Sequence, residues 1–154
     1  MTFDDALPAF IAGLDAELAI LQQVEALGAE QRAAWARNEL LPLGPLATRR
    51  AALMHDLAAI ENRIAPLRAS LRADLESACR TPGYPAAEAK ARDVQAFALR
   101  LMTADRTFLA DLEASLAGRR REAHDLETGG ATLAAYRRVV SPTVDSAALV
   151  DQRG

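Results

Sequence analysis

The chain has 154 residues, with 18 basic and 21 acidic side chains, enough to bury one core but not two. The net charge of −3 argues against a dedicated nucleic-acid-binding protein, which is normally strongly basic. A single cysteine excludes an internal disulfide and a cysteine-based zinc site. The N-terminus has no basic region typical of a secretory signal, and no apolar run approaches the roughly 20 residues of a membrane span. We therefore expect a soluble cytoplasmic protein without membrane insertion.

The first long element is an amphipathic helix over residues 5–37. Its apolar positions recur every three or four residues: Leu7, Ile11, Leu14, Leu18, Leu21, Val24 and Leu27. This spacing is typical of a helix that packs lengthwise on another. About 30 helical residues span about 45 Å, which favours an elongated bundle. Trp35 stands at its end, where we expect it to pack against the turn at 40–46.

A second helix is predicted over residues 45–77, after a turn rich in proline and glycine. Its apolar seam comprises Leu46, Leu53, Leu57, Ile60, Ile64, Leu67 and Leu71, continued by Leu75. Pro66 lies inside this pattern, and we expect it to kink the helix rather than end it, because the seam resumes in phase. Arg50 falls in an otherwise apolar slot and is expected to extend toward solvent.

A third helix is predicted over residues 85–127, after the break at 80–85. Its seam comprises Val94, Phe97, Leu101, Phe108, Leu112, Leu116 and Leu126. Asp105 interrupts this seam. Gly129-Gly130 is interpreted as the C-cap, followed by a tail that we expect to be poorly ordered.

Three long helices joined by short turns predict an all-α, antiparallel bundle of coiled-coil character. The expected division is a three-helix bundle over residues 1–128 and a flexible or amphipathic tail over 129–154.

Catalytic and metal-binding patterns are missing from the sequence. In His55-Asp56 and His124-Asp125 the adjacent side chains point about 100° apart on a helix, so neither pair shares a face. Cys79 has no histidine in its own segment. No glycine-rich loop has the surroundings of a phosphate site. We predict no catalytic residue, no metal site and no cofactor.

The last third of the chain carries the residues most suited to binding a partner. Its apolar positions beyond the bundle seam have no obvious counterpart within the chain, and exposed apolar residues often mark an interaction site. The predicted partner-binding residues are Phe108, Leu112, Leu116, Arg119, Arg120, Leu126, Leu133, Tyr136, Val139 and Val140. The run Arg119–Arg121 either complements a helix C-terminus or forms the rim of the surface.

Several of these patterns resemble the flagellar export chaperones of the FlgN type. A leucine-seamed helix containing Glu17 precedes the run Glu30-Gln-Arg-Ala-Ala-Trp35. The run from Leu46 to Leu57 is similar to that family's Leu-x-x-x-basic-x-x-Leu-Leu-x-x-Leu pattern, with Arg49 or Arg50 as the basic residue. Ala135-Tyr136 is similar to the end of the family's tail. The sister FliT type is also similar, with a tryptophan before its second helix.

This resemblance implies a cytoplasmic chaperone of flagellar type III export rather than an enzyme. Its partners would be the C-terminal helices of hook-associated proteins such as FlgK and FlgL, and the export apparatus. Its C-terminal part would hold the cargo helix. The alternative is a structural or scaffold bundle that acts by self-association, as a homodimer without a client.

Overall fold

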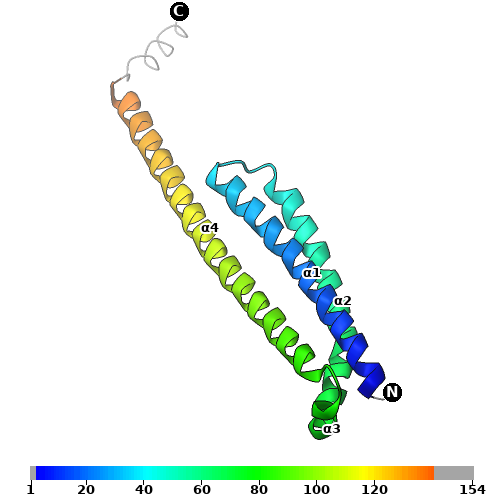
Figure 1. Cartoon of the computed structure of the whole chain (residues 1–154). Coiled ribbons are helices and arrows are strands. Elements are labelled where there is room, and N and C mark those ends of the chain that lie inside the picture. Colours follow the sequence, from blue (N-terminus) through cyan, green and yellow to red (C-terminus); the bar gives the residue numbers. More distant parts are fainter. Residues whose placement is uncertain (1–2, 141–154) are drawn as a thin grey trace, which may run out of the picture. The chain divides into compact units, whose positions relative to one another are not determined.

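The computed structural model describes the backbone of residues 3–140 and the side chains of 5–127, Gly129 and Gly130. The described backbone forms four helices and no strand, as Figure 1 shows. The helices are α1 (Phe3–Ala36), α2 (Leu43–Ala73), α3 (Leu75–Arg80) and α4 (Tyr84–Val140). Three of them are long, and the predicted all-α helical bundle is confirmed.

The chain divides into two compact units, Met1–Phe108 and Leu109–Gly154. The first contains α1, α2, α3 and the first part of α4, and the second contains the rest of α4. All buried side chains of the described residues belong to the first unit. The expected tail over 129–154 lies largely outside the described residues, so the division at residue 128 stays a prediction.

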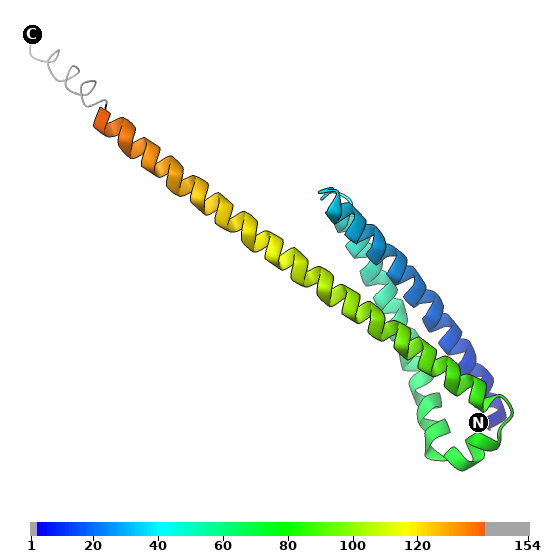
Figure 2. The ribbon, with the colours of Figure 1, turned by 60° about the vertical axis from the view of Figure 1, so that its left-hand side comes forward.

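The core of the first unit lies between α1, α2 and the early part of α4. Figures 1 and 2 show α1 and α2 antiparallel and side by side, and they form the closest helix pair. The buried cluster draws on all three helices, with these members among others: Leu14, Leu21, Val24, Ile60, Ile64, Leu71, Val94 and Leu101. These positions belong to the predicted seams, because burial of one apolar face is what that spacing serves.

A glycine sets the close approach of α1 to α2. A Cβ atom added at Gly13 would overlap Cγ2 of Ile64, a side chain that is itself buried. The two backbones therefore pack more closely here than a larger residue would allow.

The end of α1 is fixed by the left-handed residue Asn38, with φ 57°. The Glu39 amide donates to the Ala34 carbonyl at 2.9 Å, and the Asn38 amide donates to the Trp35 carbonyl at 2.9 Å. This is the Schellman arrangement, which satisfies carbonyls left open at a helix C-terminus. The turn predicted over 38–45 lies here, and α2 begins at Leu43.

The second predicted helix is in fact two helices. α2 continues past Pro66, so the expectation that the helix does not end there is confirmed. It stops at Ala73 rather than near Ser77, and α3 begins at Leu75. Asp74 caps α3 by accepting a hydrogen bond from the Ser77 amide at 3.0 Å. The seam does not continue to Leu75, which is 53% exposed.

The predicted end of the third helix at Glu127 is wrong. α4 continues through Gly129 and Gly130 to Val140. Neither glycine has the positive φ of a C-cap, since the positive-φ glycine of the described residues is Gly83, in the turn before α4. Helical neighbours on both sides thus outweigh the low helix propensity of two glycines.

By length and hydropathy, α1 is the described helix that meets the criteria of a membrane span. The segment Asp5–Ala36 contains an 18-residue window with mean hydropathy 1.2, of which 33% is buried. This differs from the expectation that no stretch of the chain is apolar enough. A core helix has the same properties, and Leu14, Leu21 and Val24 of this segment pack in the core.

Candidate functional site

The predicted partner-binding surface lies on α4. Phe108 and Leu112 are half-buried, and Leu116 is exposed together with Arg119 and Arg120. Leu126 is 77% exposed. The side chains of four further predicted members lie outside the described residues: Leu133, Tyr136, Val139 and Val140.

The apolar members of this surface share one side of the helix. Leu109, Leu112 and Leu116 follow one another at three- and four-residue intervals, so they lie within about 60° of each other. Leu126 lies at the edge of the same face, within about 100° of Leu109. Leu109 was not among the predicted partner-binding residues, but it is exposed and lies on the same face. We call Leu109, Leu112, Leu116 and Leu126, all of the second unit, the α4 apolar strip.

Two residues that interrupt the predicted seams bind each other. Arg50 of α2 donates to Asp105 of α4 at 2.6 Å and to Gln31 of α1 at 3.0 Å. The Arg50 side chain is only 18% exposed, so the expectation that it extends to solvent is wrong. Its Nε is buried without a hydrogen-bond partner. In the sequence, this pair was indicated by two charged residues of opposite sign at otherwise apolar seam positions.

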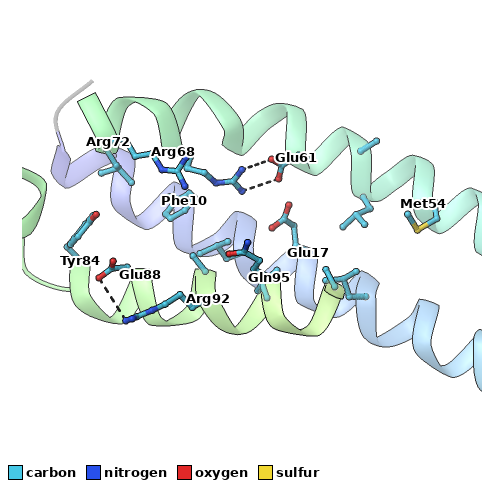
Figure 3. Close-up of a pocket in the computed structure, with 18 residues that line it drawn as sticks. Phe10, Glu17, Met54, Glu61, Arg68, Arg72, Tyr84, Glu88, Arg92 and Gln95 are labelled. Atoms are coloured by element: carbon cyan, nitrogen blue, oxygen red, sulfur yellow. Dashed lines mark hydrogen bonds and ion pairs between the residues drawn. The ribbon is translucent and has the colours of Figure 1, made fainter. Parts of the chain in front are cut away.

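An open cavity of about 700 Å³ lies between α1, α2 and the early part of α4 (Figure 3). Its apolar wall includes Phe10, Leu14, Leu57 and Val94. The lining also carries three carboxyl groups and three guanidinium groups: Glu17, Glu61, Glu88, Arg68, Arg72 and Arg92. Cavities between the helices of a bundle are frequent ligand sites.

Glu17 is the buried charged residue of this cavity, only 5% exposed. Figure 3 shows it near Glu61, which accepts two hydrogen bonds from Arg68, at 2.5 and 3.1 Å. Arg68 also lies over the ring of Phe10, 6.0 Å from its centre. Among the described residues, no guanidinium, ammonium or amide group forms a hydrogen bond with Glu17.

Burial first, and a hydrogen bond with Glu61 second, raise the pKa of Glu17 from 4.5 to about 7. The pKa of Glu61 is lowered instead, first by its hydrogen bond with Arg68 and then by that with Glu17. One contact contributes to both directions, because protonated Glu17 donates a hydrogen bond to ionised Glu61. The pair therefore holds one proton between two carboxyl groups, and the two residues titrate together.

The other sequence candidates do not assemble into a site. Among the described residues, no group of three His, Cys, Asp or Glu side chains lies close enough to hold a metal ion. Cys79 is exposed, and His55 and His124 are both exposed on their helices. Trp35 is half-buried in the last turn of α1, and its packing on the turn at 40–46 stays a prediction.

Glu17 was visible in the sequence as a carboxyl group within a leucine seam, between Leu14 and Leu21. Its partners, 44 and more residues away, could not be identified without the register of α1 on α2. A scan against family models found no match, and searches of curated proteins and of solved structures found no similar protein.

Proposed function

We propose that the chain is a non-enzymatic chaperone that holds an amphipathic helix of a client protein on the α4 apolar strip. The observation that carries the proposal is the exposure of Leu109, Leu116 and Leu126 on one side of a helix. None of the described side chains from 109 to 127 is buried. Leucines that contribute nothing to a core in this way are typical of an interaction surface.

An amphipathic helix is the partner that suits such a strip. Leucines at three- and four-residue intervals form the seam that a second helix needs. The exposed Arg119 and Arg120 lie between Leu116 and Leu126 in the sequence and favour acidic residues at the corresponding part of the client helix. Contacts of this kind set orientation and association rate more than affinity.

The class of client comes from the resemblance to FlgN-type chaperones. On that basis we propose the C-terminal helices of hook-associated proteins such as FlgK and FlgL as cargo. The chain would then hold them in the cytoplasm and deliver them to the flagellar type III export apparatus. A FliT-type role with another export cargo is the nearest variant of this proposal.

Self-association is the second candidate, because the same leucines could pair with those of a second copy. The two functions differ in what the strip contacts. A scaffold protein would form a stable homodimer through the strip and bind no client helix, whereas a chaperone would exchange any such dimer for its client.

The test is co-purification of the full chain with a C-terminal fragment of a hook-associated protein. Leu109→Asp with Leu116→Asp should reduce capture at least about ten-fold, because two charges are placed in the helix seam. Ala114→Asp, an exposed position on the opposite side of α4, is the matched control and should bind normally. Equal capture by both variants would remove the strip as the site.

The contribution of the last residues is tested separately. A chain ending at residue 128, and the variant Leu133→Asp with Tyr136→Ala, should bind the fragment more weakly than the full chain. Light scattering without client then distinguishes the alternative. If the strip variant converts a dimer into a monomer and no fragment binds the wild type, the chain is a self-associating scaffold.

A further inference from the structure

The cavity of the first unit has features that the proposed chaperone function does not use. Its lining residues lie between Phe10 and Ala98, and none of them belongs to the α4 apolar strip. Its volume of about 700 Å³ lies in the range of small-molecule sites, roughly 300–1,000 Å³. A buried carboxyl group faces it, which is costly unless a partner compensates the charge.

The charges around Glu17 show which partner is missing. Arg68 and Arg72 come from α2 with Glu61, and Glu88 and Arg92 come from α4. Arg68 is committed to Glu61 by two hydrogen bonds, and Arg92 lies 4.0 Å from Glu88. Arg72 also lines the cavity, and its side chain is exposed to solvent. Arg68 lies near enough to Glu17 to oppose the rise of its pKa, but among the described lining residues Glu17 is the carboxyl group that forms no ion pair.

We propose that this cavity binds a monovalent organic cation with an apolar body, of the alkylammonium class, whose ammonium group pairs with the buried Glu17 carboxyl group. The ammonium donates hydrogen bonds to the Glu17 carboxylate. The hydrocarbon chain lies against Leu14, Leu57 and Val94. An anion would be repelled by the Glu17 carboxylate. A neutral alcohol carries no charge and would not displace the proton from the carboxyl pair.

The exchange conserves charge. Below the raised pKa of Glu17 the pair carries one proton, and binding of an ammonium ion sends this proton to the solvent. At pH 6 each bound cation should release about one proton, and at pH 8.5 almost none. This release does not depend on the affinity, and its loss on substitution of Glu17 identifies Glu17 as the group that receives the cation.

The experiment is isothermal titration of the full chain with octylamine, below its micellar concentration, in buffers of different ionisation enthalpy. Octylamine should bind at least about ten-fold more tightly than octan-1-ol, and octanoate should not bind. Nα-acetyl-lysine methylamide presents a side-chain ammonium group on a peptide backbone. It should bind at least about ten-fold more weakly than octylamine. Tighter binding of the peptide form would overturn the assignment to a free small cation.

Two variants complete the test. Glu17→Gln should lose the proton release and bind octylamine no better than octan-1-ol. Glu88→Gln removes a carboxyl group from the same lining but should keep both properties. If Glu17→Gln unfolds, the proton release of the wild-type chain at pH 6 decides alone. Absence of that release, or equal binding of octylamine and octan-1-ol, would overturn the proposal.

Discussion

Glu17 and Glu61 contribute to folding stability in opposite pH ranges. Burial first, and the hydrogen bond with Glu61 second, raise the folded-state pKa of Glu17 from 4.5 to about 7. A group with a raised folded pKa stabilises the fold below its unfolded pKa, and this contribution is lost as pH rises through the folded pKa. Glu61, with its lowered pKa, stabilises the fold above its unfolded pKa and loses that contribution as pH falls.

We therefore expect the wild-type chain to lose stability between pH 5 and pH 8. The loss should reach at most about 3 kcal/mol, at about 1.4 kcal/mol per unit of pKa shift. Glu17→Gln does not titrate and should be the more stable protein at pH 8. Urea denaturation at the two pH values measures the difference. Glu25→Gln, an exposed residue of the same helix, should keep the wild-type dependence. The same pH slope in Glu17→Gln would show that Glu17 is not the cause.

Removing one partner of the Arg50–Asp105 ion pair should lower the free energy of unfolding more than replacing both partners with apolar residues. Asp105→Ala leaves a largely buried guanidinium group with Gln31 as its remaining hydrogen-bond partner, and should cost about 1–3 kcal/mol in urea denaturation. Arg50→Leu combined with Asp105→Leu continues the apolar seams and should recover most of this loss. Asp93→Ala, exposed on the same helix, should change stability by less than about 0.5 kcal/mol. If Asp105→Ala leaves the free energy of unfolding unchanged, the ion pair does not stabilise the fold.

At the scale of the helices, Gly13 determines how closely α1 and α2 pack. Alanine raises helix propensity by about 1 kcal/mol over glycine, but at this position its methyl group would overlap Ile64. We expect Gly13→Ala to lower the free energy of unfolding by about 1–2 kcal/mol, because overpacking exceeds the gain in propensity.

Gly44→Ala is the control for this substitution. No atom lies within 4 Å of a Cβ at Gly44, also a helical glycine, so alanine there should be neutral or slightly stabilising. Thermal unfolding followed by circular dichroism measures both variants. If the two alanine variants are equally stable, the close approach at Gly13 is not a constraint on the packing.

The helix ends show which signals a sequence carries. The turns at 38–45 and 80–85 were predictable, because proline and glycine restrict the backbone wherever they stand. The break at Asp74 was missed, although Asp74 and Ser77 form a capping pair, since Leu71 and Leu75 continued the apolar spacing. The Gly129-Gly130 pair predicted a helix end, but α4 continues through it, because the effect of glycine on a helix depends on the helix propensity of its neighbours.

At the scale of the whole molecule, the first unit should fold without the second. All buried side chains of the described residues lie before residue 102, so a chain of residues 1–108 keeps the complete core. We expect this fragment to unfold cooperatively, within about 0.5 kcal/mol of the full chain in urea. The fragment 109–154 should be only marginally helical by circular dichroism, since an isolated helix gains no tertiary packing. Failure of 1–108 to unfold cooperatively would contradict the division into units.

The division also explains how much of the candidate sites the sequence could predict. The α4 apolar strip was largely predictable, because its residues lie on one helix and their spacing alone places them together. The cavity was not, because Glu17, Glu61 and Arg68 meet only through the packing of α1 on α2. Local periodicity gives the faces of helices, whereas contacts between helices need their relative register.

The exposed leucines of the α4 apolar strip and the buried leucines of the core should differ in how well they tolerate substitution. A polar residue at Leu14 would disrupt the core, and selection for folding alone would remove it. A polar residue at Leu126 would cost almost nothing in stability. Folding therefore gives no reason to keep leucine along this part of α4. Any selection for leucine at these positions would have to act on what the folded chain binds.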